Sequence, residues 1–274
     1  MEQIRLVALD LDGTVFNDQK EITPRTLAAI RAALQKGVTV LPATGRTADG
    51  VPEQFTSIPG VRYALTSNGA SVVDLQTGEQ LVSLPFAPDL ARRTYRALLP
   101  FGGMLSIFIG GKSYTTRENA ELSLDITPPN LRSYFRKTRI EVEDMDKTLL
   151  EHAHEVEKFS MMYATVEQRD AAWRGMEAAC PELEIASSIE RNLELSAPGV
   201  TKGRGLMALA AHLGLTPGQV MAVGDSGNDL TMVQMAGLGV AMANATPDVL
   251  AAADVVTGDN NHDGVAQAIE KYVL

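Results

Sequence analysis

The chain has little cysteine and no long apolar run. Cys180 is the single cysteine among 274 residues, so no disulfide can form within the chain, as is typical of proteins in a reducing compartment. No apolar stretch approaches the about 20 residues that a membrane-spanning helix needs. The N-terminal segment, whose apolar run is interrupted by Asp10, does not resemble a signal peptide. We therefore expect a soluble, cytoplasmic protein that does not bind a membrane.

Basic residues are also scarce relative to acidic ones. The chain has 24 Lys and Arg against 34 Asp and Glu, a formal net charge of −10. This balance argues against a nucleic-acid partner, because nucleic-acid binders usually present a basic surface to the phosphates. An enzyme with this charge and an anionic substrate would need local positive charge at its site, from a metal ion and one or two Lys or Arg.

Strand-length apolar runs alternate with helical segments in the first and last parts of the chain. Residues 4–9 form a continuous apolar run, typical of a buried parallel strand. Thr23 and Pro24 predict the start of a helix and Gly37 its end, and 38–41 is the next strand. The same alternation later predicts helices at 202–213, 247–252 and 264–272, and strands at 220–223, 238–241 and 254–256.

The middle of the chain does not alternate in this way. The expected elements are helices at 89–99 and 168–180 and strands at 104–109, 140–142, 159–166 and 183–186, with a hairpin turn at Gly110-Gly111. We therefore predict an α/β protein: a doubly wound, Rossmann-like parallel sheet with an α+β module inserted into it. The predicted bounds are 1–82 and 192–274 for the discontinuous core and 83–191 for the insert.

The first polar loop, Asp10-Leu11-Asp12, follows the first predicted strand. Residues i and i+2 of extended backbone point the same way, so both carboxylates would face one site. Leu11 would turn its side chain into the core and leave its backbone N–H for a phosphate oxygen. Such a pair suits a nucleophile, Asp10, and a general acid and base, Asp12. Alternatively, the aspartates cap a turn before Gly13, although the apolar run before Asp10 argues against this.

Two weaker signals lie elsewhere in the predicted core. Thr44 and Gly45 follow the second strand and could cradle an anion with a hydroxyl and a backbone N–H. An ordinary turn with Thr44 as a helix cap explains them equally well. Lys202 falls in the first turn of a helix that Thr201 could cap. Because a cation there opposes the helix dipole, it suggests a nearby anion, but a solvated surface lysine is the alternative.

The fourth loop, residues 224–229, reads Gly-Asp-Ser-Gly-Asn-Asp after a predicted strand. Its carboxylates are hard oxygen ligands of the kind that Mg²⁺ prefers. Asp225 is the best candidate for a direct ligand, and Asp229 could bind directly or through water. The amide of Asn228 can donate to a phosphate. The alternative is a polar turn with side-chain capping.

These four segments, in this order, resemble the four sequence motifs of the haloacid dehalogenase superfamily. The first loop, continued by Gly13-Thr14, matches the first motif in full, and residues 224–229 match the fourth. Thr44 and Lys202 fall at the second and third. The stretch 67–70 (Ser-Asn-Gly-Ala) and the large insert resemble the Cof-type branch, which carries a class IIB α/β cap. The resemblance covers the whole chain and implies a catalytic core with a substrate-specificity cap.

The resemblance also implies an activity and a set of site residues. It implies a Mg²⁺-dependent phosphatase that hydrolyses small phosphorylated metabolites such as sugar phosphates through an aspartyl-phosphate intermediate. Asp10 would be the nucleophile, and Asp12 the acid and base. The implied phosphate-binding residues are Leu11, Thr44, Gly45, Lys202 and Asn228. The implied metal ligands are Asp10, Asp12 (through its backbone carbonyl), Asp225 and Asp229.

Two other functions share these motifs. A phosphomutase would form the same intermediate and return the phosphoryl group to a substrate. A non-catalytic phosphate sensor would be expected to lack the nucleophile or the acid, and both are present. Asn68, Arg117 and Asn119 are candidate substrate-reading residues, although each is also explained as an ordinary surface polar residue. The sequence does not distinguish a monomer from a homodimer.

Overall fold

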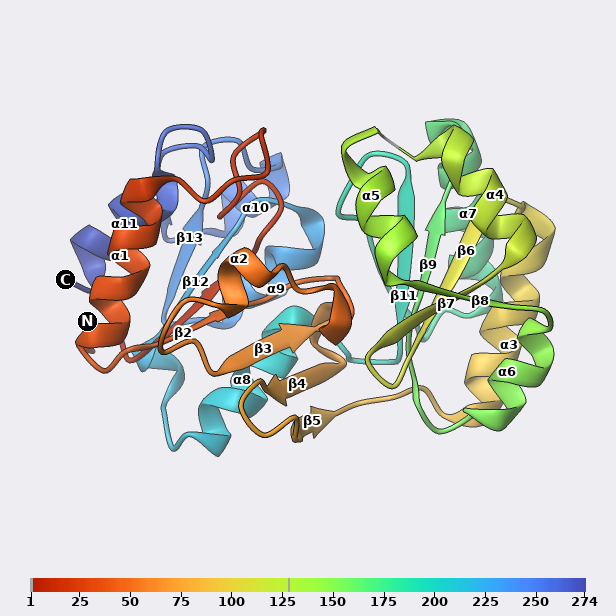
Figure 1. The fold of residues 1–274 in the computed structure, drawn as a ribbon, viewed down its shortest axis with the longest axis horizontal. Helices are drawn as coiled ribbons and strands as arrows, with labels where there is room; N and C mark the ends of the chain where they lie inside the picture. The colour runs from red at the N-terminus through yellow and green to blue at the C-terminus, as the bar shows by residue number, and fades with distance from the viewer. Residues whose placement is uncertain (1, 128) are drawn as a thin grey trace. The chain divides into compact units, whose positions relative to one another are not determined.

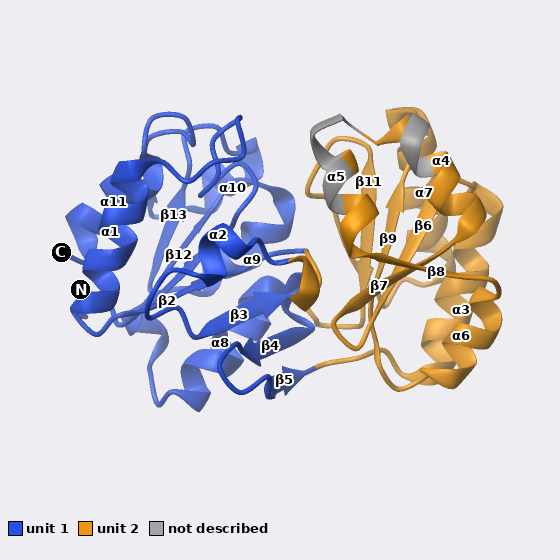
Figure 2. Ribbon diagram, in the orientation of Figure 1, with its two compact units in different colours: residues 1–45, 51–83, 201–274 blue, residues 46–50, 84–200 orange. Residues whose placement is uncertain are grey.

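The computed structural model describes residues 2–127 and 129–274, which form two compact units (Figures 1 and 2). Each unit has its own sheet. Within the described ranges, no helix combines the length and the apolar character needed to cross a bilayer. Unit 1 comprises residues 1–45, 51–83 and 201–274, and unit 2 comprises residues 46–50 and 84–200.

Unit 1 is built on a sheet with the strand order β14-β13-β12-β1-β2, in which every neighbouring pair is parallel. From β1 the chain continues to β2 at one edge of the sheet, and from β12 it continues through β13 to β14 at the other edge. Ligands of such sheets bind beyond the carboxyl ends of the strands at this switch point. The strands are β1 (Leu6–Leu9), β2 (Thr39–Pro42), β12 (Val220–Gly224), β13 (Leu238–Ala241) and β14 (Val255–Val256).

Helices cover both faces of this sheet (Figure 1). Val7 and Leu9 of β1 belong to the core cluster that contains residues of α1 and α11. Leu6 and Ala8 belong to the opposite cluster, which contains residues of α8. The predicted α/β fold is therefore confirmed for this unit. Its helices are α1 (Pro24–Gln35), α2 (Glu53–Thr56), α8 (Lys202–His212), α9 (Leu230–Met235), α10 (Pro247–Ala252) and α11 (Gly264–Tyr272).

A three-stranded antiparallel sheet extends unit 1 beyond β2. An isolated parallel bridge between Ala43 and Leu65 joins it to the main sheet. The short helical turn η2 (Ser67–Gly69) links its first two strands. The strands are β3 (Tyr63–Thr66), β4 (Ser71–Asp74) and β5 (Gln80–Ser83).

Unit 2 has a six-stranded sheet with the order β10-β11-β9-β6-β7-β8, in which only β7 and β8 run parallel. The predicted hairpin is confirmed, because Gly110-Gly111 joins β6 to β7. The strands are β6 (Met104–Ile109), β7 (Lys112–Thr116), β8 (Arg139–Val142), β9 (Val156–Met162), β10 (Glu184–Ala186) and β11 (Asn192–Ser196). The helices are α3 (Pro88–Leu98), α4 (Arg117–Ile126), α5 (Pro129–Thr138), α6 (Met145–Glu151) and α7 (Val166–Ala179).

The two faces of this second sheet differ in chemistry. Residues paired across neighbouring strands point to the same side, so the register assigns each side chain to a face. One face is apolar, and the ring of Phe159 on it meets Phe86 at a centroid distance of 5.2 Å. The other, here called the polar face, carries a buried ion pair between Lys158 and Glu194 at 2.8 Å. The polar face also contains Ser106, Ser113, Thr115, Ser160, Asn192 and Ser196.

The structure differs from the sequence prediction at three places. Residues 192–200 belong to unit 2 rather than to the core, because β11 pairs with β9 and β10. Residues 46–50 also group with unit 2. The strand predicted at 159–166 ends at Met162, because Thr165 caps the helix that begins at the next residue. Val166 looked like a strand residue because it is β-branched and apolar.

Candidate functional site

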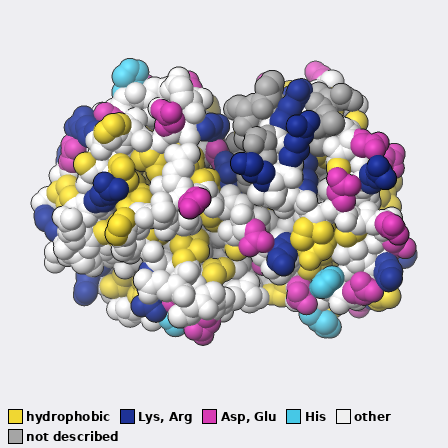
Figure 3. Space-filling view, viewed as in Figure 1, with side chains coloured by type: hydrophobic (Ala, Val, Ile, Leu, Met, Phe, Trp, Pro, Cys, Tyr) yellow, Lys and Arg dark blue, Asp and Glu magenta, His cyan; other side chains and the backbone are white. Residues whose placement is uncertain are grey.

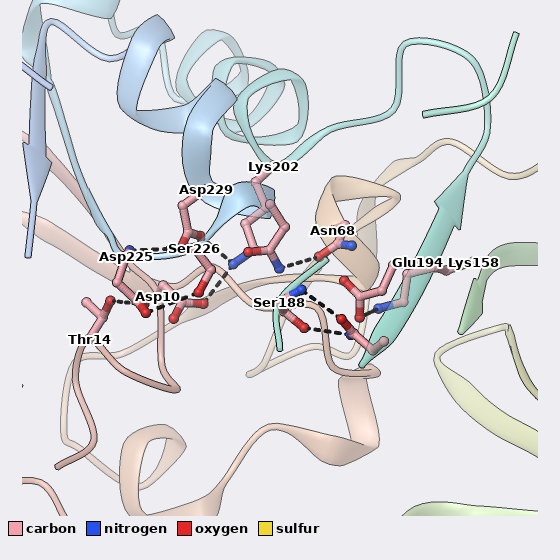
Figure 4. A network of polar contacts seen from close by, with 12 residues as sticks. Asp10, Thr14, Asn68, Lys158, Ser188, Glu194, Lys202, Asp225, Ser226 and Asp229 are labelled. Atoms are coloured by element: carbon pink, nitrogen blue, oxygen red, sulfur yellow. Dashed lines mark hydrogen bonds and ion pairs between the residues drawn. The ribbon is translucent and has the colours of Figure 1, made fainter. Parts of the chain in front are cut away.

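Three carboxylates meet where β1 and β12 end (Figure 4). Asp10 directly follows β1, and Asp225 and Asp229 lie in the loop after β12. One oxygen from each lies within 4.8 Å of the other two. Asp10 is only 7% exposed and Asp229 is fully buried. Like charges this close repel one another unless a proton or a cation compensates them.

Lys202 supplies part of that compensation. Its Nζ donates to Asp10 Oδ1 at 2.7 Å and to Asp229 Oδ1 at 2.6 Å, and its side chain is fully buried. The predicted helix cap is confirmed, since Thr201 Oγ1 accepts a hydrogen bond from Arg204 N–H. A solvated surface position for Lys202 is therefore wrong, and the anions that its unusual placement suggested are these two carboxylates.

The pKa values of these groups follow from burial and mutual charge. Burial, and then the charge of Asp229, raise the pKa of Asp10 well above its ordinary value, although Lys202 opposes the shift. Burial and Asp229 also raise the pKa of Asp225 to about 6. Burial lowers the pKa of Lys202, but Asp10 and Asp229 outweigh it, so the pKa of Lys202 lies above its ordinary value. Lys202 is therefore charged, and the cluster retains an excess of negative charge for a second cation.

Asp229 also shapes the loop that contains Asp225. Its Oδ2 accepts the backbone N–H groups of Asp225 and Ser226, each at 3.0 Å. Because its Oδ1 accepts from Lys202, both oxygens are engaged by N–H donors. Asp229 thus fixes the positions of the loop and of Lys202.

Thr14 and Ser226 hold the carboxylate of Asp225, a role that sequence reasoning missed. Thr14 Oγ1 donates to Asp225 Oδ1 at 2.9 Å, and Ser226 Oγ donates to Oδ2 at 3.1 Å. Gly13 has a φ of +92°, and a Cβ there would lie 2.5 Å from Asp225 Oδ2. The only available signal was their presence within the two motif loops.

The other residues of the first loop lie as follows. Leu11 is fully buried in the core, which confirms the predicted direction of its side chain. Asp12 lies outside the acidic cluster, and its carboxylate pairs with Lys20 at 2.9 Å. Both partners are about one-third exposed, at 34% for Lys20 and 33% for Asp12. Such a solvated pair contributes little to stability, so Asp12 can exchange this partner for another.

The predicted phosphate-binding segments are linked by short contacts. Thr44 is 2% exposed, and its backbone carbonyl accepts the N–H of Asn68 at 3.2 Å. Asn228 Nδ2 donates to Asn68 Oδ1 at 3.1 Å, and both side chains are buried. Gly45 follows Thr44 at the end of unit 1's first segment. Asn68 is therefore a buried member of this set rather than a surface polar residue.

Arg117 and Asn119, the other candidate substrate readers, lie in α4 of unit 2. Asn119 Oδ1 accepts a hydrogen bond from the N–H of Leu105, and its Nδ2 donates to Thr116 Oγ1. This side chain therefore connects α4 to β6 and β7. Arg117 borders a pocket of about 270 Å³ formed by α4, α5 and β8. Figure 3 shows Lys and Arg side chains gathered on this part of unit 2. The pocket is lined by Arg117, Ala120, Glu121, Phe135, Arg136, Arg139 and Glu141.

Residues 7–269 match the family model of the haloacid dehalogenase-like hydrolases. The chain belongs to this family. It is 32% identical over 273 residues to the 5-amino-6-(5-phospho-D-ribitylamino)uracil phosphatase YcsE of Bacillus subtilis, covering 99% of this chain and 96% of that one. A haloacid dehalogenase-like hydrolase from B. subtilis has the same fold, with a TM-score of 0.84 and 28% identity over 98% of this chain and 99% of that one.

A solved sugar phosphatase of haloacid dehalogenase subclass IIB superposes with a TM-score of 0.81 at 23% identity, over 97% of this chain and 98% of that chain. At this identity the similarity concerns the fold. The predicted fold of the haloacid dehalogenase family, a parallel core with an inserted cap, is therefore confirmed. Of the residues that match its motifs, Asp10, Lys202, Asp225 and Asp229 lie together in one buried cluster.

Proposed function

We propose that this chain, a phosphoric monoester hydrolase of the haloacid dehalogenase family, uses Mg²⁺ and an aspartyl-phosphate intermediate at Asp10 to hydrolyse small hydroxyl-rich metabolites such as sugar phosphates. The observation that carries the proposal is the buried Lys202, which holds Asp10 through Oδ1. This contact orients the carboxylate and leaves Oδ2 for attack on phosphorus. Phosphoryl transfer depends mainly on such positioning and on neutralising charge.

The chemistry proceeds in two steps. An oxygen of Asp10 bonds to phosphorus while the bond from phosphorus to the leaving oxygen breaks, and Asp12 gives its proton to that oxygen. Asp12 then takes a proton from a water molecule, whose oxygen bonds to phosphorus and releases Asp10 and inorganic phosphate. The phosphate oxygens would be held by Lys202, Asn228, Thr44, Gly45 and the N–H of Leu11.

The donor set of the acidic cluster fits Mg²⁺. Carboxylates of Asp10 and Asp225 are hard oxygen ligands, and few protein carboxylates are usual for this ion. The backbone carbonyl of Asp12 would complete the protein's contribution. Asp229, whose two oxygens also accept N–H bonds, would bind the ion directly or through a water molecule. When bound, Mg²⁺ would offset the repulsion between an anionic nucleophile and an anionic phosphate.

Asp12→Asn should separate acid–base catalysis from folding. The substitution removes the proton donor and acceptor, so kcat is expected to fall by about 10²–10⁴-fold. The fall in kcat/KM, which reports formation of the phosphoenzyme, should be smaller for an activated substrate such as p-nitrophenyl phosphate, whose leaving group needs little protonation. Steady-state kinetics on that ester and on an alkyl phosphate would measure the difference. An equal loss of kcat/KM on both esters would contradict the assignment of Asp12 as the acid.

Asp225→Asn should show how much the charge of Asp225 destabilises the metal-free fold. The pKa of Asp225 is raised to about 6 from 3.8, so ionisation destabilises the metal-free fold as the pH rises from about 4 to 6, and the loss is complete above 6. In EDTA, the variant is therefore expected to melt at a higher temperature than the wild type near pH 8, and at a similar temperature near pH 4.

Magnesium should reverse that order, because it stabilises the state that binds it. Adding Mg²⁺ near pH 8 is expected to raise the melting temperature of the wild type and to leave that of Asp225→Asn almost unchanged. Differential scanning fluorimetry with EDTA, Mg²⁺ or Ca²⁺ would measure both. Identical melting of the wild type in EDTA and in Mg²⁺ would count against a metal site at this cluster.

The name of one relative supports a hydroxyl-rich substrate. YcsE, a relative over nearly the whole chain, is named for a substrate with a phosphorylated ribityl group.

A phosphate-release screen would test the function. Its panel would contain sugar phosphates, polyol phosphates, nucleotides, flavin mononucleotide and pyridoxal phosphate, with Mg²⁺, beside an Asp10→Asn control. Selective release from hydroxyl-rich esters is expected. No release from any ester would contradict the proposal, and transfer to a second substrate hydroxyl without release would favour a mutase.

A further inference from the structure

The turn between β3 and β4 has an unusual backbone. Ser67, Asn68 and Gly69 have φ values of 51°, 56° and 92°, three successive residues in the left-handed region. Glycine adopts this region freely and asparagine does so more often than most residues, but serine rarely does. Strained backbone of this kind persists only where the surroundings enforce it, and it is often found at functional sites.

The surroundings of this turn are the predicted phosphate-binding segments. The N–H of Asn68 donates to the carbonyl of Thr44. A Cβ at Gly69 would lie 2.1 Å from the carbonyl oxygen of Thr201, which is the cap of the helix that begins with Lys202. The turn therefore packs against the second and third motifs without space for a side chain.

The side chain of Asn68 extends these contacts to the fourth motif. Its Oδ1 accepts from Asn228 Nδ2 at 3.1 Å, between two buried side chains (Asn68 appears in Figure 4). Asn228 Oδ1 is buried and has no partner among the described residues. An amide nitrogen has two N–H groups, so Asn228 keeps one N–H and an unpaired oxygen for a ligand.

We propose, building on the phosphatase function above, that Asn68 is a positioning residue that fixes the amide of Asn228 for the phosphate group. An amide has nearly the same shape when it is rotated by about 180°, so packing alone selects its orientation poorly. The acceptor Oδ1 of Asn68 selects the orientation in which Asn228 Nδ2 is the donor. The rotated amide would turn its oxygen towards Asn68 Oδ1, and two acceptors repel each other. The left-handed turn holds Asn68 where this selection is possible.

Asn68→Gly removes the side chain of Asn68 and keeps the backbone conformation of the turn. Glycine retains the left-handed conformation without strain, so the fold should survive while the acceptor is lost. Its kcat/KM for p-nitrophenyl phosphate is expected to fall about threefold to tenfold, as is usual for one hydrogen bond. The Kd of inorganic phosphate, measured by calorimetry with Mg²⁺, should rise by a similar factor. Asp263→Gly is the matched control, because Asp263 has a φ of 59° and occupies the N-cap position of α11 without a side-chain capping bond. It should leave both constants unchanged.

A double-variant cycle tests whether Asn68 acts through Asn228. If it does, Asn68→Gly combined with Asn228→Ala should bind phosphate no more weakly than Asn228→Ala alone. Wild-type phosphate affinity in Asn68→Gly, or losses that multiply in the double variant, would overturn the proposal. A protein that binds phosphate with this dependence on Asn68 but hydrolyses no ester would contradict the proposed hydrolysis and still support the role of Asn68. A wild type that binds no phosphate would overturn both.

Discussion

Asp10→Asn is expected to lower kcat by at least about 10⁴-fold, because it removes the atom that bonds to phosphorus. Losses of this size accompany the removal of a covalent nucleophile. The amide has almost the same shape as the carboxylate, so Lys202 Nζ can still donate to its oxygen. Substrate binding should therefore persist while turnover stops. Single-turnover kinetics with a ³²P-labelled ester should show phosphoenzyme in the wild type and none in the variant.

The stability of Asp10→Asn should change in the opposite direction to its activity. Burial and the charge of Asp229 raise the pKa of Asp10, so its ionised form costs folding free energy that the neutral amide does not. We expect an equal or higher melting temperature for the metal-free variant near pH 8. Asp89→Asn is the control, because the side chain of Asp89 in α3 is 92% exposed. Phosphoenzyme formed by Asp10→Asn would disprove the nucleophilic role.

The sequence predicted that the site residues lie close together, because the ends of strands can be recognised from the sequence. The apolar run before Asp10 and the strand before Asp225 both require loops at the carboxyl edge of one parallel sheet. The cap at Thr201 fixed the start of α8 and so placed Lys202. These inferences depend on local patterns, and the structure supports them through the contacts of Lys202 with Asp10 and Asp229.

Features that depend on distant partners could not be predicted. Thr14 binds Asp225 across 211 positions of sequence, and no local pattern gives that pairing. The left-handed turn at Ser67 contradicts the preference of serine and exists because Thr44 and Thr201 confine it. The extent of unit 2 was missed because β11, read alone, fits either sheet. In each case tertiary contacts outweigh local preference.

Lys202→Met should damage both the fold and the chemistry. Methionine has a similar length but no charge, so Asp10 and Asp229 would remain buried without a cation. Breaking a buried ion pair from one side typically costs about 3–5 kcal/mol. For a chain of this size, the melting temperature should fall by on the order of 10 °C. The loss should be smaller near pH 5 than near pH 8, because the pKa of Asp10 is raised and its protonation costs less at the lower pH.

Activity should fall further than stability explains. The ammonium group offsets charge on the phosphate in the transition state, and losing such a cation costs about 10³–10⁵-fold in kcat. Combining Lys202→Met with Asp229→Asn separates the effect on stability from the effect on activity. The second substitution removes one of the two buried carboxylates that Lys202→Met leaves without a cation. The double variant should recover part of the lost melting temperature and none of the lost kcat. Recovery of turnover along with stability would mean that Lys202 serves only the fold, and that Asp10 attacks phosphorus without its help.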